Sequence, residues 1–229
     1  MTNPRIIAEG SGFRVFCLPT GPLETNTYLL VSDKEAAIVD PAGDIPAFER
    51  LVKSEHADLV RILITHAHAD HIAGCSDVKR LFPDALLTVP KFESDWLDHT
   101  ALSLSYFVGG SPDVPAADAL VQNADTVQIG TVALQCLLLP GHTPGSTAYY
   151  AAAESLLFCG DVLFEGSIGR MDLPGGDETA MRNSLQTVAS LPGETVVLPG
   201  HGPQTTISQE LMGNCYLTPY APRRYDPHG

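Results

Sequence analysis

One short stretch of the chain concentrates side chains that can bind metal ions. Residues 65–71 read THAHADH, and the possible ligands among them are His66, His68, Asp70 and His71. Imidazole and carboxylate groups bind zinc, iron and similar divalent ions well. A single ion could hardly take four ligands from so short a loop. Two ions a few ångströms apart could share these side chains, with further ligands from distant positions.

A strand and a helix are expected to hold this stretch in place. The preceding run 59–64 (LVRILI) is apolar and has the length of a buried strand. After it, apolar residues recur at helical spacing at Ile72, Cys75, Val78 and Phe82. The cluster is thus predicted where a strand ends and a helix begins, which is where α/β folds build their sites.

Three more candidate ligands follow predicted strand ends further along the chain. His142 lies after the apolar run 132–139, Asp161 after 156–159, and His201 after 195–198. Each histidine alone would more often be an ordinary loop residue. Together with the first cluster they make seven candidate ligands at four strand ends, which indicates one shared metal centre.

The remaining pattern favours sheets with helices packed outside them. Further strands are expected at 13–18, 27–31, 36–39, 86–89, 127–129 and 148–151, and helices near 48–52 and after Asp177. Strands outnumber helices, so we expect sheet packed on sheet with helices outside. Asp40 ends a strand before a turn, and it is either a hydrogen-bond acceptor for the ligands or an ordinary turn residue. Residues 91–120 give no clear signal.

Composition excludes several classes of function. The formal net charge of the 229-residue chain is −14 and no basic run occurs, which argues against partners such as nucleic acid or an anionic membrane surface. No signal peptide and no membrane span is recognisable. The five cysteines form no Cys-x-x-Cys pair, so we expect a cytoplasmic protein whose cysteines are small core residues. A structural zinc site would be rich in cysteine, and this ligand set has none.

As an ordered set, the motifs THAHADH (65–71), GHTPG (141–145), GD (160–161) and PGHG (199–202) resemble the metallo-β-lactamase-like superfamily. The resemblance covers nearly the whole chain and implies a single domain, 1–229, of the α/β class. Its fold would be the four-layer αβ/βα arrangement, with two mixed β-sheets face to face and helices on both outer faces. It also implies three groups of ligands: His66, His68 and His142 for one metal, Asp70, His71 and His201 for the other, and Asp161 bridging both.

The loop 163–177 is similar to the glyoxalase II branch, which hydrolyses acylglutathione thioesters such as S-lactoylglutathione. In that branch a basic residue of this loop contacts glutathione, and Arg170 is the matching position. Full-length members carry a C-terminal helical domain that is missing here, so the chain resembles the short bacterial type and its thioester could carry another thiol. The expected cofactors are two divalent metal ions, zinc first and iron or manganese as alternatives. The protein is expected to be a monomer or a homodimer.

The resemblance implies a hydrolase in which a hydroxide bridging the metals attacks the thioester carbonyl, while Asp70 both ligates and orients that hydroxide. Two alternatives remain open. Persulfide dioxygenases share the THxHADH and GRxD sequences and hold one iron by positions matching His66, His142 and Asp161. They typically carry a PAHDY-like sequence after the last strand, where this chain has PGHGP (199–203). A lactonase or β-lactamase is the other alternative, because the ligands do not specify the acyl group.

Overall fold

Two mixed β-sheets form the centre of the computed structural model, which describes residues 3–110 and 113–221. The first sheet has seven strands in the order β1 (Arg5–Gly10), β2 (Phe13–Thr20), β3 (Thr25–Ser32), β4 (Glu35–Val39), β5 (Asp58–Leu63), β6 (Leu86–Pro90) and β7 (Ala119–Val121). The second has six, in the order β15 (Thr205–Thr206), β14 (Val196–Pro199), β11 (Leu156–Gly160), β10 (Thr147–Ala151), β9 (Val132–Leu138) and β8 (Thr126–Ile129). A small hairpin joins β12 (Leu163–Phe164) to β13 (Ser167–Ile168).

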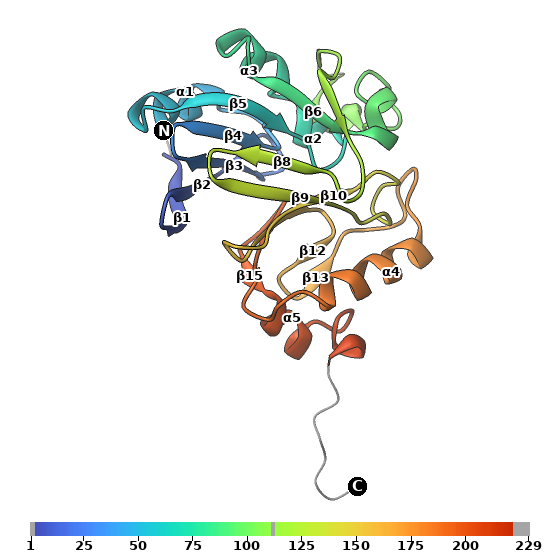
Figure 1. The fold of residues 1–229 in the computed structure, drawn as a ribbon. Coiled ribbons are helices and arrows are strands. Elements are labelled where there is room, and N and C mark those ends of the chain that lie inside the picture. The colour runs from blue at the N-terminus through green and yellow to red at the C-terminus, as the bar shows by residue number, and fades with distance from the viewer. Residues whose placement is uncertain (1–2, 111–112, 222–229) are drawn as a thin grey trace, which may run out of the picture.

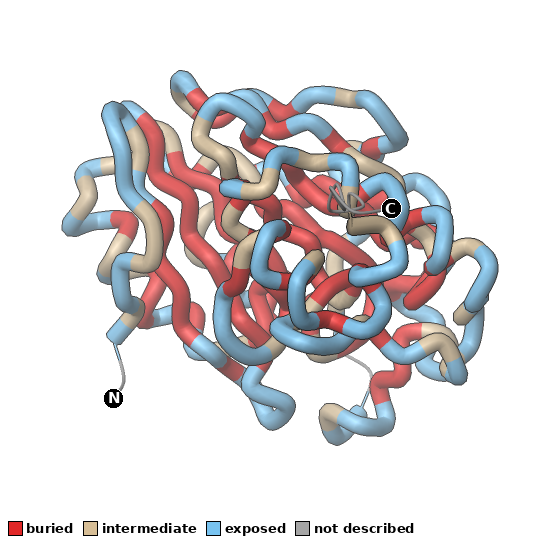
Figure 2. The backbone as a smooth tube through the Cα atoms, turned by 90° about the horizontal axis from the view of Figure 1, so that it is seen from below, coloured by how far each residue is buried: buried red, intermediate tan, exposed pale blue. Residues whose placement is uncertain are grey.

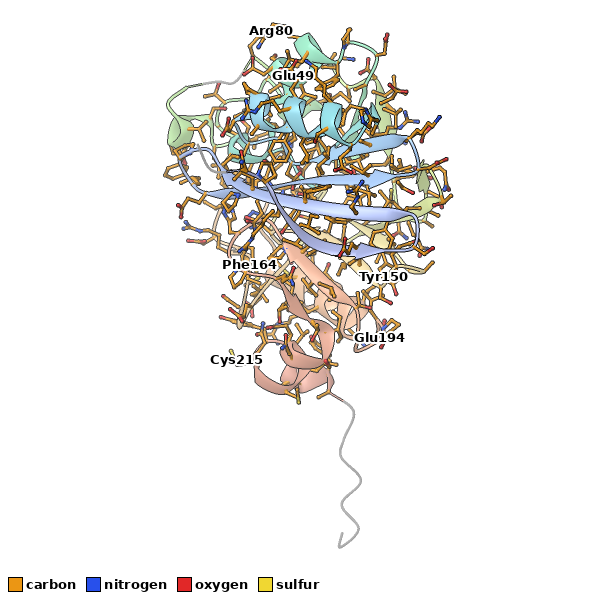
Figure 3. All side chains as sticks on the ribbon, turned by 90° about the vertical axis from the view of Figure 1, so that its left-hand side faces the viewer. Glu49, Arg80, Tyr150, Phe164, Glu194 and Cys215 are labelled. Carbon is orange, nitrogen blue, oxygen red and sulfur yellow. The ribbon has the colours of Figure 1, made fainter. Side chains whose placement is uncertain are left out.

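Helices cover the outer face of each sheet (Figure 1). The first sheet carries α1 (Ile45–Ser54), α2 (Ala69–Ile72) and α3 (Cys75–Leu81), and the second carries α4 (Glu178–Ala189) and α5 (Ile207–Gly213). Short 3₁₀ helices are η1 (Lys91–Trp96), η2 (Ser105–Val108) and η3 (Thr218–Tyr220). Figure 3 shows Glu49 of α1 and Arg80 of α3 at the opposite end of the molecule from Cys215, which follows α5. The predicted fold, two mixed sheets with outer helices, is confirmed.

Alternating side chains divide the interior into three apolar layers. In β3, Leu29 and Val31 pack under the helices of the first sheet, whereas Tyr28 and Leu30 pack between the sheets. Because successive residues of a strand point to opposite faces, a strand buried on both sides reads as a continuous apolar run. The third layer lies between the second sheet and α4 and α5. Figure 2 shows the resulting distribution, with buried residues along the strands and exposed residues over the outer turns.

The helix expected after the metal-binding stretch is in fact two short helices, and Asp70 and His71 lie inside the first of them. Gly74 separates α2 from α3. Its N–H donates to the carbonyl oxygen of Pro41 at 2.7 Å, and a Cβ on Gly74 would lie 2.7 Å from that oxygen. Because the Gly74 N–H bonds the Pro41 carbonyl oxygen, it is not available for the bond that would extend α2.

The cysteines follow the expectation with one exception. Cys17, Cys75, Cys136 and Cys159 are buried as predicted, but Cys215 is exposed because it lies in the turn after α5. Burial raises the pKa of the Cys159 thiol to about 12, so this residue is no nucleophile despite its position two residues before Asp161. In the described residues, no helix combines the length and the apolar character needed to cross a membrane.

Candidate metal centre

All seven candidate ligands converge at one end of the two facing sheets. The first cluster follows β5 of the first sheet, and the other three ligands follow β9, β11 and β14 of the second. Their donor atoms fall into three groups within 4.8 Å of one another: His66, His68 and His142; His66, His71 and Asp161; and Asp70, His71 and His201. The structure therefore brings together every ligand position proposed from the sequence, from elements of both sheets.

Three imidazole nitrogens form the first group. His68 Nδ1 lies 3.0 Å from His66 Nε2 and 3.0 Å from His142 Nε2. Nitrogens bound at 2.0–2.1 Å to one tetrahedral ion are about 3.3 Å apart, so this triad has the dimensions of a single metal site. His66 and His68 come from the loop after β5, whereas His142 comes from the loop after β9, so the triad joins the two sheets.

The side chains of Asp70, His71 and His201 form the other candidate metal site, which is called the second group or second triad below. Asp70 Oδ2 lies 3.5 Å from His71 Nε2 and 3.2 Å from His201 Nε2. Asp161 lies between the two groups: Oδ1 is 3.4 Å from His71 Nε2, and Oδ2 is 3.6 Å from both His142 Nε2 and His201 Nε2. The Asp161 carboxylate thus faces both triads, as a bridging ligand must.

Unpartnered atoms at the centre fit the presence of cations. His71 Nε2 and Asp161 Oδ1 are buried and have no hydrogen-bond partner, which is costly for polar atoms unless another group binds them. Gly200 leaves the room they need, since a Cβ on it would lie 2.1 Å from Asp161 Oδ1. The donor set of imidazoles and carboxylates suits divalent zinc, iron or manganese. The residues present therefore fit two divalent metal ions.

The protonation states favour metal binding in the first group. Burial and the neighbouring imidazoles lower the pKa of His66 well below its usual value, and similar causes lower that of His68 to about 3, which leaves both rings neutral. Burial opposes ionisation of Asp161, but the adjacent His71 outweighs it and lowers the pKa of Asp161 to about 2. Neutral imidazoles and ionised carboxylates are the forms that bind metal ions. Burial favours neutral rings at His71 and His201 as well, but the neighbouring carboxylates outweigh it and raise both pKa values, so a metal ion there would displace their protons.

Five of the seven ligands have a further hydrogen bond that fixes their orientation: His66, Asp70, His71, His142 and His201. His71 Nδ1 bonds Asp40 Oδ2 at 2.9 Å, and Asp40 also accepts bonds from the backbone N–H and the hydroxyl of Thr65 at 2.8 and 2.7 Å. Asp40 is therefore an acceptor for the ligands and not merely a turn residue. Asp70 Oδ2 accepts a bond from Thr25 Oγ1 at 2.8 Å. Such outer partners tune metal affinity and set ring orientation.

Glu93 is a functional candidate that the sequence did not reveal. Its side chain is fully buried in η1, where Oε2 accepts the Ala67 N–H at 2.6 Å and Oε1 accepts the Gly145 N–H at 2.7 Å. Ala67 lies between His66 and His68, and Gly145 lies three residues after His142. Glu93 thus ties together the two loops that supply the first triad. Nothing in the stretch 91–120 signals this role, because it depends on tertiary packing.

A cavity of about 520 Å³ opens onto the cluster. It is lined by five of the ligands, His68, Asp70, His142, Asp161 and His201, and by mostly apolar residues from η2 and the β12–β13 region. Arg170, the residue predicted to contact substrate, also lines it. Its guanidinium, however, is bonded to both carboxylate oxygens of Asp172 at 2.8 Å. The volume is typical of a small-molecule site.

Comparison with known proteins agrees with this centre. The family model described as "Metallo-beta-lactamase superfamily" matches residues 20–201. A Bacillus subtilis protein named "Probable metallo-hydrolase YqgX" is 35% identical over 89% of this chain and 97% of its own length. "Hydroxyacylglutathione hydrolase GloC" of Haemophilus influenzae is 29% identical over 87% of this chain and 96% of its own length.

Two solved structures are similar over the same span. One, described as the BLEG-1 B3 metallo-beta-lactamase, has a TM-score of 0.83 and 43% identity, and the match covers 89% of this chain and 99% of that one. The other, TTHA1623 in a di-iron-bound form, has a TM-score of 0.80 and 33% identity over 88% of this chain and 100% of that one. From its fold, its converging ligands and the family match across most of its length, the chain belongs to the metallo-β-lactamase superfamily.

Proposed function

We propose that this chain is a dinuclear metallohydrolase that cleaves a thioester, S-lactoylglutathione or a related acyl-thioester. The observation that carries the proposal is the second triad, Asp70, His71 and His201, beside a complete first triad, with Asp161 facing both. The similarity to a hydroxyacylglutathione hydrolase supports the thioester assignment. Zinc is the metal we propose, and the di-iron form of a similar structure makes iron the first substitute to test.

The chain's own residues would bind and orient the reactants. His66, His68 and His142 would hold one ion and Asp70, His71 and His201 the other, with Asp161 between them. A pair of bound divalent ions supplies an acidified water molecule and polarises a carbonyl group. Asp70 is the catalytic residue we propose: Thr25 fixes its carboxylate at 2.8 Å, so that it can accept a hydrogen bond from the attacking water.

The leaving group explains why no general acid is needed. A thiol ionises with a pKa near 8.5, so a thiolate departs without prior protonation. Among the described residues that line the cavity there is no lysine, tyrosine or glutamate to act as an acid. This lining suits a thioester better than an ester, whose alkoxide leaving group is far more basic.

A second candidate is hydrolysis of a β-lactam, favoured by the 43% identity to the BLEG-1 B3 metallo-beta-lactamase. A competition between substrates tests the two. Zinc-loaded protein should cleave an acyl-thioester with a kcat/KM at least about tenfold above that for a cephalosporin, because a β-lactam amide needs protonation of its nitrogen as it leaves. A cephalosporin preferred over every thioester would replace the proposal by the second candidate.

A further inference from the structure

We infer that the site takes thioesters with an apolar acyl group on a neutral thiol, rather than thioesters of glutathione. The inference rests on the proposed thioesterase function and narrows its substrate class. Two observations carry it: the cavity has two apolar walls, and Arg170, the only arginine or lysine among the described residues that line it, is paired with Asp172.

One apolar wall comes from η2 and the residue before it. Leu104, Phe107 and Val108 line the cavity beside His68. This wall is attached to the metal-binding helix, since the Ala69 N–H donates to the Ser103 carbonyl oxygen at 2.7 Å. Phe107 is 54% exposed, and an exposed aromatic side chain at the mouth of a cavity is an apolar surface available to a ligand.

Leu104 itself has a backbone conformation that points to function. Its φ of 57° and ψ of 31° are left-handed, a region that residues with a Cβ adopt at a cost of about 1 kcal/mol. Such strain persists where the surrounding structure requires a side chain in one place, and it gathers at binding sites. Here it accompanies a leucine that is nearly buried and lines the substrate cavity.

A second apolar wall lies beside the second triad. Phe164, Ile168 and Leu173 come from the β12–β13 hairpin and the loop after it. The Phe164 ring centroid is 6.2 Å from that of His201, which places this wall against the ligand most open to solvent. In Figure 3, Phe164 lies at the level between the first sheet and the C-terminal helices. A carbonyl held at the cluster would therefore have apolar surface from both segments within the same cavity.

The charge of the lining opposes glutathione. Glutathione carries two carboxylates and one ammonium group, so its recognition needs cationic side chains. Among the described residues that line the cavity, Arg170 is the only arginine or lysine. Two of its three guanidinium nitrogens, Nε and Nη2, donate to Asp172 in a bidentate pair, and the carboxylate offsets the positive charge of Arg170. A neutral thiol needs no cationic partner, and an apolar acyl chain can contact the apolar walls.

A substrate series tests the inference directly. N-acetylcysteamine, a neutral thiol, would be acylated with acetyl, butyryl and hexanoyl groups, and the same acyl groups would be placed on glutathione. Burial of each added methylene should raise kcat/KM about threefold to fourfold. At equal acyl length, the glutathione thioester should be no better than the neutral one. A flat chain-length series, or S-lactoylglutathione preferred over hexanoyl-N-acetylcysteamine, would overturn the inference.

Two exposed phenylalanines give a matched pair of variants. Phe107 lines the cavity, whereas Phe92 is 61% exposed and does not line it. Phe107→Ser should lower the hexanoyl-to-acetyl ratio of kcat/KM about tenfold, because part of the apolar wall is lost. Phe92→Ser should leave that ratio within about twofold of wild type. Equal hexanoyl-to-acetyl ratios in the two variants would show that η2 does not bind the acyl group.

Binding of uncleavable analogues separates this inference from the proposed function. Calorimetry with metal-loaded protein would compare S-hexyl-N-acetylcysteamine with S-methylglutathione. Tighter binding of the hexyl compound without cleavage of any thioester would retain the inferred cavity specificity and refute the thioesterase function. Thioester cleavage together with tighter binding of S-methylglutathione would support the thioesterase function and refute the inferred cavity specificity. If the protein neither cleaves thioesters nor binds the hexyl compound selectively, both are wrong.

Discussion

The ligand side chains differ in how firmly the protein holds them. His66, His68, His71 and His142 are almost fully buried, whereas the His201 side chain is 29% exposed. The second ring nitrogen of His201 bonds the Leu23 carbonyl oxygen at 3.2 Å, a longer contact than the 2.9 Å between His71 and Asp40. His201 can therefore be removed with less disturbance than the buried ligands, which makes it the best probe of the second metal position.

We expect His201→Ala to lower the metal content from two ions per chain towards one. The variant removes one of the three ligands of the second group and leaves His66, His68 and His142 in place. Elemental analysis of fully loaded protein measures the content directly. His99→Ala is the matched control, because His99 is exposed and belongs to none of the ligand groups, and it should retain two ions. One ion in wild type together with an unchanged His201→Ala would show that the second site does not exist.

Substitutions of Arg170 and Asp172 should have opposite effects on the KM for an anionic thioester. Arg170→Ala should raise KM for S-lactoylglutathione, which we infer to be a poor substrate, only slightly and with little change in kcat, because Asp172 already engages the guanidinium. Asp172→Asn should lower that KM about two- to fivefold, since it releases an exposed guanidinium from its partner. Arg182→Ala is the control, because Arg182 forms a similar exposed pair with Glu178 on α4 and does not line the cavity. Identical kinetics for all three variants would exclude Arg170 from the site.

Among the elements, the loops that supply the first triad follow strands of different sheets. A contact between these loops is therefore needed to fix their relative position. The loop after β5 belongs to one sheet and the loop after β9 to the other. The Glu93 carboxylate accepts one backbone N–H from each loop and is buried away from water. It is therefore a positioning residue for the first triad.

Glu93→Gln should weaken metal retention without removing a ligand. The amide keeps one acceptor oxygen but presents an NH₂ group to a backbone N–H, so one of the two bonds is lost. Loss of such outer contacts typically costs about 10–100-fold in metal affinity, and a buried unpaired donor costs about 1–3 kcal/mol of stability. Competition with a chelator measures the affinity. Glu178→Gln, an exposed change on α4, should have no effect, and equal affinities in both variants would contradict the positioning role.

The strand ends could be predicted from the sequence, but the contacts between loops could not. A buried strand such as β5 or β11 is an apolar run, and a histidine or aspartate directly after it stands out, so His66, Asp161 and the other ligands were identifiable. Glu93 and Leu104 lie in or beside short 3₁₀ helices that have no apolar period. Their roles depend on packing between distant segments. The same holds for the break at Gly74, which the contact with Pro41 requires.

At the scale of the whole molecule, bound metal would join the two sheets at their common end. The first triad takes two ligands from the loop after β5 of the first sheet and one from the loop after β9 of the second. Without cations, the centre leaves buried polar atoms such as His71 Nε2 and Asp161 Oδ1 without a hydrogen-bond partner. Metal binding is therefore coupled to folding stability.

Removal of the metal ions by a chelator should lower the melting temperature. Occupancy at 100 times Kd stabilises the folded state by about 2.7 kcal/mol, which corresponds to about 5–10 °C for a chain of this size. Differential scanning calorimetry of metal-loaded and metal-free protein measures the shift, and added zinc should restore it. A melting temperature that does not respond to removal and return of metal would mean that the cluster binds no ion tightly.

The most direct test of the account is thioester cleavage by zinc-loaded protein in the absence of oxygen. A hydrolase with both ligand groups filled needs only water and two divalent ions, whereas a persulfide dioxygenase needs iron and oxygen at a single site. We predict that anaerobic zinc-loaded protein cleaves acyl-thioesters at the same rate as in air. The contradicting result would be an iron-dependent uptake of oxygen on addition of glutathione persulfide, with no cleavage of any thioester.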